Sequence, residues 1–125
     1  MTKKDEYKEY LKKRVIVDFD DTLCIYDLNS TGVCDGTPNH ELIRKLQELH
    51  QVGFNIEIFT ARGHFSAKNR NEASRKYKNI MENWLKEHKV PYDNLSFNKP
   101  YGIIYIDDKA VRPDELSRLD SLMYE

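Results

Sequence analysis

Several features that would mark particular classes of protein are scarce in this chain of 125 residues. Its two cysteines, Cys24 and Cys34, lie ten positions apart and lack the spacing of a metal-binding motif. Its longest apolar run, IIYI at 103–106, is too short to span a membrane, and its charged N-terminus has no apolar core of a signal peptide. Lys and Arg (20) nearly cancel Asp and Glu (21), so no basic excess points to nucleic acid or to an anionic membrane surface. We therefore expect a cytoplasmic protein with reduced cysteines that binds neither nucleic acid nor a membrane.

What the chain does contain is an alternation of short β-branched or aromatic runs with helical patterns. Strands are predicted at 15–19, 54–59, 94–97 and 102–106. Helices are predicted at 3–13, from Thr37-Pro38 to Gly53, at 67–88 and at 113–123. This order is typical of an α/β protein in which helices cover both faces of a parallel sheet. With no repeat, low-complexity tract or linker, residues 1–125 are expected to form one domain.

Polar side chains follow each predicted strand. In an open parallel sheet, ligands bind beyond the carboxyl ends of the strands, so these side chains are expected to meet in one crevice. They are Asp18, Asp20 and Asp21 after the first strand, Thr60 after the second, Lys99 after the third, and Asp107 and Asp108 after the fourth. Each alone has an ordinary explanation as a turn former, a helix cap or a loop residue, and only the set is informative.

So many carboxylates in one crevice would repel one another without a cation. Carboxylate, carbonyl and water oxygens suit Mg²⁺, and a Thr hydroxyl with a Lys ammonium suits the remaining oxygens of a phosphoryl group. Phosphoryl transfer depends on positioning and charge neutralisation, and a free carboxylate can act as the nucleophile and form an aspartyl-phosphate. The set therefore predicts a Mg²⁺-dependent phosphoryl-transfer site.

Four segments resemble, in order, the motifs of the haloacid dehalogenase-like phosphohydrolases. VIVDFDDT resembles their first motif, a hydrophobic strand followed by DxDxT, and IEIFT resembles the second. Lys99 takes the place of the third-motif lysine, and IIYIDD is similar to the fourth motif. The flanking stretches DFDDTLC, FTAR, NKPYG and YIDDKAVRPDEL resemble a bacterial subfamily of capsule-biosynthesis phosphatases.

This resemblance covers residues 15 to 112 and implies both a fold and a substrate class. The fold would be a three-layer α/β sandwich with an open, mainly parallel, Rossmann-like sheet and no cap domain. The substrate would be a phosphorylated sugar or a sugar-linked intermediate of capsule or surface polysaccharide biosynthesis.

The resemblance also implies a role for each matched residue. Asp18 would be the nucleophile and a Mg²⁺ ligand. Asp20 would be the general acid and then the general base, with its backbone carbonyl on the metal. Thr60 would bind the phosphoryl oxygens and Lys99 would neutralise the nucleophile and the phosphate. Thr22 is a lesser candidate, for which bracing of the loop is favoured over contact with substrate.

The remaining candidates have more open roles. By the resemblance, Asp107 would complete the metal site, and Asp108 would help directly or through water. The family commonly has glycine where Asp21 stands, so its side chain either contacts substrate or only forms a turn. Arg62 is either a ligand for a second anionic group or a solvated surface arginine. Arg112 either contacts substrate or pairs with neighbouring acids.

The spacing of the motifs leaves no room for a large cap over the site, and the loop at 27–38 is the one obvious flap. The chain either forms a homo-oligomer that covers the crevice or takes a substrate that projects from an open site.

A response-regulator receiver domain is the alternative from another class, since it shares the length, the parallel sheet, the acids, Mg²⁺, Thr and Lys. A receiver runs from an acid pair to a phosphorylatable Asp, then Thr, then Lys. This chain runs from DxD to Thr, Lys and an acid pair, with no lone strand-end Asp before Thr60. The order favours the phosphatase. A binding protein without catalysis is disfavoured because Asp18 and Asp20 are both present.

Overall fold

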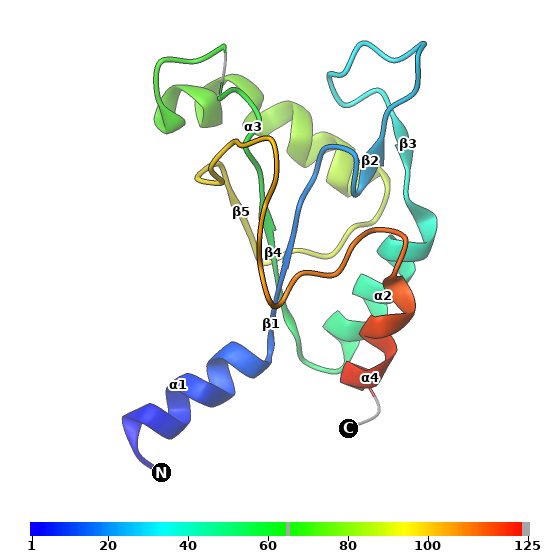
Figure 1. Ribbon diagram of the computed structural model, residues 1–125. Helices are drawn as coiled ribbons and strands as arrows, with labels where there is room; N and C mark the ends of the chain where they lie inside the picture. Colours follow the sequence, from blue (N-terminus) through cyan, green and yellow to red (C-terminus); the bar gives the residue numbers. More distant parts are fainter. Residues whose placement is uncertain (65, 124–125) are drawn as a thin grey trace.

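The computed structural model describes residues 1–64 and 66–123 and shows a mixed α/β chain (Figure 1). Its helices are α1 (Lys3–Lys12), α2 (His40–Gln51), α3 (Arg70–Glu87), the 3₁₀ helix η1 (Leu116–Leu119) and α4 (Asp120–Met123). Its strands are β1 (Arg14–Val17), β2 (Cys24–Ile25), β3 (Thr37–Pro38), β4 (Asn55–Phe59) and β5 (Asn94–Ser96). No helix within the described ranges is both long enough and apolar enough to cross a membrane.

Three strands form a small open parallel sheet in the order β1-β4-β5. Val17 is aligned with Ile58, and Phe59 with Ser96, so the three strands end at the same edge. β2 and β3 form a separate antiparallel pair. The predicted parallel strand pairing is therefore present, and the residues that follow β1, β4 and β5 share one end of the sheet.

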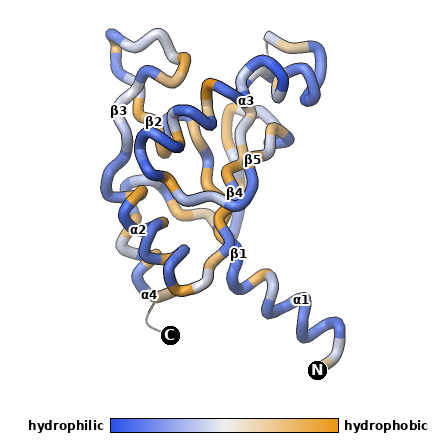
Figure 2. The backbone as a smooth tube through the Cα atoms, turned by 180° about the vertical axis from the view of Figure 1, so that it is seen from behind, coloured by the Kyte–Doolittle hydropathy of each residue, from blue (hydrophilic) through white to orange (hydrophobic). Residues whose placement is uncertain are grey.

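The core lies where α2 and α3 pack their apolar faces against the strands. Buried residues on these helices recur at helical spacing: Leu42, Ile43, Leu46 and Leu49 on α2, and Ala73, Met81, Trp84 and Leu85 on α3. Trp84 meets Phe19 edge to face, with 5.1 Å between ring centroids. In Figure 2 the strands of the sheet are hydrophobic, whereas α1 is mainly hydrophilic and extends away from the rest of the chain. None of the residues of α1 is buried.

The observed start of α2 differs from the predicted one. Thr37 and Pro38 form β3 instead of the first turn of the helix, which begins at His40. Asn39 is the N-cap, because its side-chain oxygen accepts a hydrogen bond from the Leu42 N–H at 3.2 Å. The last predicted helix, 113–123, is shorter and consists of η1 and α4.

The strand predicted at 102–106 is not formed within this chain. Within the described ranges, no backbone–backbone hydrogen bond involves residues 100–111. In Figure 1 this segment, in orange, runs from the upper end of the sheet to the lower end of β1 and then to the C-terminal helices. A parallel strand beside β1 needs a crossover of about a dozen residues or more. Only residues 97–102 separate β5 from this segment, so local strand propensity is overridden by topology.

Candidate active site

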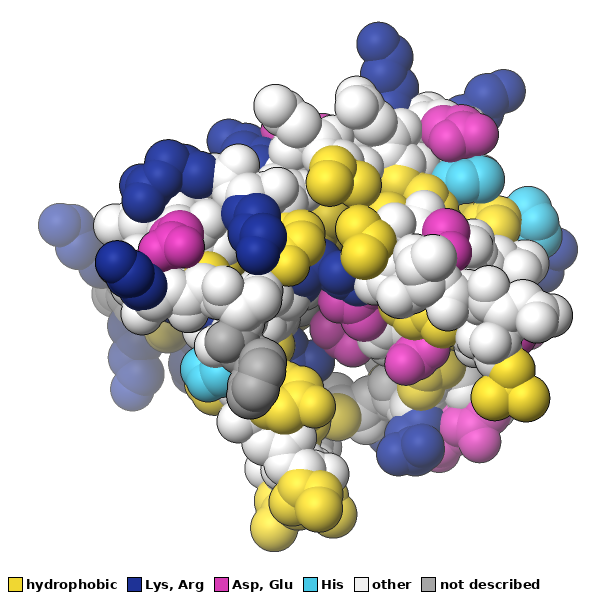
Figure 3. All heavy atoms as spheres, turned by 90° about the horizontal axis from the view of Figure 1, so that it is seen from above, with side chains coloured by type: hydrophobic (Ala, Val, Ile, Leu, Met, Phe, Trp, Pro, Cys, Tyr) yellow, Lys and Arg dark blue, Asp and Glu magenta, His cyan; other side chains and the backbone are white. Residues whose placement is uncertain are grey.

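An open cavity of about 530 Å³ lies at the carboxyl ends of β1 and β4. It is lined by two groups of residues, one acidic or basic and one small or aromatic: Asp18, Asp20, Asp21, Arg62 and Lys99 in the first, and Ala61, Gly63, His64, Tyr101, Gly102 and Tyr105 in the second. Seen from above, Figure 3 shows acidic and basic side chains together in a central hollow. The volume is in the range of small-molecule sites.

Asp18 directly follows β1 and forms an ion pair across the cavity. Its Oδ1 lies 3.2 Å from Nζ of Lys99, and its Oδ2 accepts a hydrogen bond from the Thr22 hydroxyl at 3.2 Å. Burial raises the pKa of Asp18, and the contacts with Lys99 and Thr22 act in the opposite direction. The predicted proximity of Asp18 to Lys99, and the bracing position of Thr22, are therefore observed.

Asp20 has a separate set of partners. Arg62 binds its carboxylate in a fork, with Nε at 3.2 Å from Oδ2 and Nη2 at 2.5 Å from Oδ1. The Tyr26 hydroxyl also donates to Oδ1, at 2.6 Å. Burial and the hydrogen bond to ionised Asp20 both raise the pKa of Tyr26. The two carboxylates of the DxD motif thus lie in different environments, one beside a lysine and one beside an arginine and a phenol.

Arg62 is neither a solvated surface residue nor free to meet substrate in this conformation. Its side chain is 11% exposed, and Nη2 also donates to the Gly32 carbonyl in the loop at 27–36. Burial acts to lower the pKa of Arg62, but the pairing with Asp20 outweighs it and raises that pKa. Arg70 from α3 donates to the Arg62 carbonyl at 2.7 Å. Arg62 therefore connects the acid of the site to the flap.

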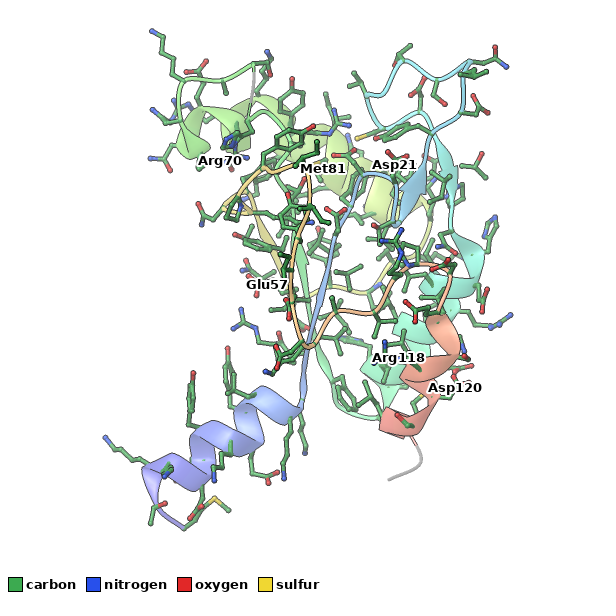
Figure 4. The ribbon with its side chains drawn as sticks, in the orientation of Figure 1. Asp21, Glu57, Arg70, Met81, Arg118 and Asp120 are labelled. Atoms are coloured by element: carbon green, nitrogen blue, oxygen red, sulfur yellow. The ribbon has the colours of Figure 1, made fainter. Side chains whose placement is uncertain are left out.

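Asp21 has a turn-forming role. Its φ is +59°, a left-handed conformation that glycine adopts most readily and Asp tolerates. Its N–H donates to the Cys24 carbonyl at 2.8 Å, and its Oδ1 accepts from the Tyr26 N–H at 3.2 Å. Figure 4 shows Asp21 near the upper end of β1. The positive φ explains physically why glycine suits this position.

Thr60 lies at the end of β4 but does not line the cavity. It is fully buried, and its hydroxyl accepts a hydrogen bond from the Arg62 N–H at 3.0 Å. Its carbonyl accepts from the Lys99 N–H at 3.3 Å. In this conformation Thr60 anchors the backbone of both cationic residues of the site.

Asp107 and Asp108 are not brought to the cavity. The side chain of Asp108 is 83% exposed and lies 3.2 Å from Nζ of Lys109, which lowers the pKa of Asp108. Asp107 accepts from the Lys109 N–H at 2.7 Å. The described part of the chain holds no group of three or more His, Cys, Asp or Glu placed to bind a metal. The predicted convergence fails here because the strand that would carry these acids is not in the sheet.

Arg112 also lies outside the cavity. Its Nε is 3.8 Å from Asp114, and both side chains are largely exposed, so it pairs with a neighbouring acid.

Aromatic residues of the site were not predicted from the sequence. Lys99 lies over the ring of Tyr105, 4.6 Å from its centroid, and the Tyr105 hydroxyl donates to the Pro100 carbonyl at 2.6 Å. Tyr101 stacks with His64, with 6.0 Å between ring centroids. Tyr101 stands in the stretch NKPYG and Tyr105 in IIYIDD, and their closeness in sequence to Lys99 was the signal that could have marked them as site residues.

Comparison with known proteins identifies a similar solved structure. No protein-family model and no curated protein matches the chain. Among solved structures it is similar to the crystal structure of a structural-genomics target from Vibrio cholerae, with 34% sequence identity and a TM-score of 0.66. The match covers 90% of this chain and 97% of that one.

Proposed function

The chain belongs to the same family as that Vibrio cholerae protein, and from this premise we propose that it is a phosphomonoester hydrolase that acts through an aspartyl-phosphate. The observation that carries the proposal is the placement of the DxD motif. Asp18 lies 3.2 Å from Lys99 in an open cavity, and Asp20 is held by other partners. Two carboxylates in different environments suit two different roles in one reaction.

In the first step an oxygen of Asp18 attacks the phosphorus, and the bond from phosphorus to the leaving oxygen breaks. The protonated form of Asp20 gives its proton to that oxygen. In the second step ionised Asp20 takes a proton from a water molecule, whose oxygen attacks the phosphorus of the aspartyl-phosphate. The bond from phosphorus to the Asp18 oxygen then breaks, which releases inorganic phosphate and restores the Asp18 carboxylate. Lys99 is placed to neutralise negative charge on Asp18 and on the phosphoryl group.

Arg62 constrains the first of these steps. Its guanidinium donates to both carboxylate oxygens of Asp20, so in this conformation neither oxygen is free to give a proton to the leaving group. The proposal therefore includes a shift of Arg62 from Asp20 towards the anionic substrate when substrate binds. Arg62 would then fill the role of an anion ligand that the sequence left open.

For the substrate we propose a phosphorylated sugar or a sugar-linked intermediate of capsule or surface polysaccharide synthesis, hydrolysed in the cytoplasm. The cavity is open, and Tyr101 and Tyr105 line it beside Lys99. Aromatic side chains offer apolar faces to a sugar ring while Lys99 meets the phosphate. The resemblance of the flanking stretches to capsule-biosynthesis phosphatases supports this substrate class. The resemblance of the four motifs to haloacid dehalogenase-like phosphohydrolases supports the phosphohydrolase and a three-layer sandwich fold.

A requirement for Mg²⁺ is part of the proposal, and when bound the ion would neutralise charge on the reacting phosphoryl oxygens. The residues of one chain do not fit such a site by themselves. Asp18 offers a carboxylate, but the carboxylate of Asp20 is bound by Arg62 and Tyr26. The acid pair at 107–108 lies outside the cavity, as described above. In this conformation the described residues of one chain therefore bring only part of the expected carboxylate set to the cavity.

The test is release of inorganic phosphate from p-nitrophenyl phosphate and from a panel of sugar phosphates, with Mg²⁺ and with EDTA. We expect turnover with Mg²⁺ that Asp18→Asn abolishes, with an unchanged circular dichroism spectrum because the change is nearly isosteric. Asp114→Asn removes an exposed acid outside the cavity and is the matched control, expected to keep full activity. Turnover by Asp18→Asn would contradict the nucleophile assignment. Stable labelling of the wild type by acetyl phosphate without turnover would favour a receiver domain.

A further inference from the structure

β1 has a free edge. It pairs with β4 on one side, and within the described ranges no strand pairs with its other side. An uncovered edge strand presents unpaired N–H and C=O groups that readily pair with another strand. Ile16, in the middle of β1, is 58% exposed. The sheet therefore ends at a strand suited to further pairing.

A segment suited to fill this edge is also present and unpaired. Ile103, Ile104 and Ile106 are 104%, 73% and 96% exposed, with Tyr105 between them at 50%. Four consecutive residues of high strand propensity thus lie in solvent, without backbone partners in the described chain. Burying three isoleucine side chains is strongly favourable, so an arrangement that leaves all of them exposed is incomplete.

From these two observations we propose that residues 103–106 pair, parallel, with the free edge of β1 in a second copy of this chain. The exchange is reciprocal, because each copy has one such strand and one such edge, and a two-fold arrangement satisfies both. The sheet of each subunit then has four strands, one of them from its partner.

The length of the chain argues for a second copy. Parallel pairing with β1 of the same chain needs about a dozen or more connecting residues, and only 97–102 are available. Antiparallel pairing within the chain is within reach, since six extended residues span about 20 Å. That pairing, however, would carry Asp107 and Asp108 to the amino end of β1, away from Asp18.

Pairing in parallel with a second copy has a consequence for the active site, and this part rests on the proposed function. The acids at 107 and 108 follow the exchanged strand directly, so they would lie at the carboxyl end of the other copy's β1, beside its Asp18. They would supply the carboxylate ligands that a single chain lacks. The complete site is then formed by two chains.

The first test measures association without any assay of activity. Sedimentation and light scattering of the full chain should give a dimer, and Ile104→Asp should give a monomer with at least a ~100-fold weaker association, since a charge cannot enter the buried face of a sheet. Leu28→Asp is the matched control, because Leu28 is 103% exposed on the flap and should leave the dimer intact.

Hydrogen exchange should show amides 103–106 protected in the dimer and unprotected in Ile104→Asp. A monomer with freely exchanging amides at 103–106 would overturn the proposal. Protection in a monomer would also overturn it and would indicate pairing within the chain.

The second test mixes two inactive variants. One carries Asp18→Asn, and the other carries Asp107→Asn with Asp108→Asn. After subunits exchange at equal concentrations, half of the dimers are mixed, and one of their two sites has every native acid. Activity should therefore return to about a quarter of the wild-type value. A mixture that stays inactive, with a dimer confirmed by mass, would refute the shared site. If the wild type itself has no phosphatase activity, the proposed function fails. The first test still decides the strand exchange in that case.

Discussion

The pair formed by Arg62 and Asp20 gives the sharpest test of the structure. We expect Arg62→Gln to destabilise the protein because it removes both hydrogen bonds of the fork and leaves Asp20 with only the Tyr26 hydroxyl. Forty-two positions separate the two residues, so their contact reports the tertiary arrangement rather than local structure.

The expected loss of unfolding free energy in Arg62→Gln depends on how deeply the side chains of Arg62 and Asp20 are buried. Removing one partner of a fully buried ion pair costs about 3–5 kcal/mol. The side chain of Arg62 is 11% exposed, but that of Asp20 is 30% exposed, so water can reach the carboxylate left behind. The expected loss is therefore smaller, about 2 kcal/mol, which for a domain of this size lowers Tm by roughly 8 °C.

The assay is a double-mutant cycle with Arg62→Gln, Asp20→Asn and the combined variant, followed by urea and thermal unfolding at one protein concentration. Each single variant leaves one charge of the pair without its partner, whereas the combined variant leaves none. The combined variant should therefore be more stable than the sum of the single losses predicts, by about 1–2 kcal/mol. Arg112→Gln makes the same substitution at an exposed pair and should leave Tm unchanged. A coupling below about 0.3 kcal/mol would show that the fork is absent in solution.

Three further substitutions test individual positions. Asp21→Gly should change the free energy of unfolding in urea by less than about 1 kcal/mol, because two effects offset each other: glycine suits the positive φ, but the hydrogen bond from the Tyr26 N–H is lost. A loss above about 3 kcal/mol would contradict the turn-forming role of Asp21. Gly63→Ala should lower Tm clearly, since its φ is +79° and a Cβ would lie 2.8 Å from that of Ala73; an unchanged Tm would contradict this packing. Thr60→Val should cost about 1–2 kcal/mol, because it leaves a backbone N–H without its buried acceptor, whereas Thr60→Ser should recover most of the loss.

Much of the framework could be predicted from the sequence because it depends on local pattern. Alternation of short apolar runs and helical faces indicated β1, β4, β5 and the helices α2 and α3. The rule that parallel strands end at one edge then placed Asp18, Asp20 and Lys99 around one cavity. Neither inference needed a contact between distant residues to be known in advance.

The partners of these residues could not be predicted in the same way. Nothing in the sequence marks Arg62 and Tyr26 as the residues that hold Asp20, because side-chain pairing depends on loop conformation. The need for a left-handed backbone at Asp21 likewise arises from the turn that brings its N–H to Cys24.

The sequence by itself determined that 103–106 has the character of a buried strand and that two acids follow it. Only the tertiary structure decided that this strand has no place in its own chain's sheet. The physical reason is the length of the connection: strand propensity is a local property, whereas parallel pairing with β1 requires a crossover that six residues cannot make. The same constraint separates Asp107 and Asp108 from Asp18, and it is the reason why we propose that a second copy of the chain completes the site.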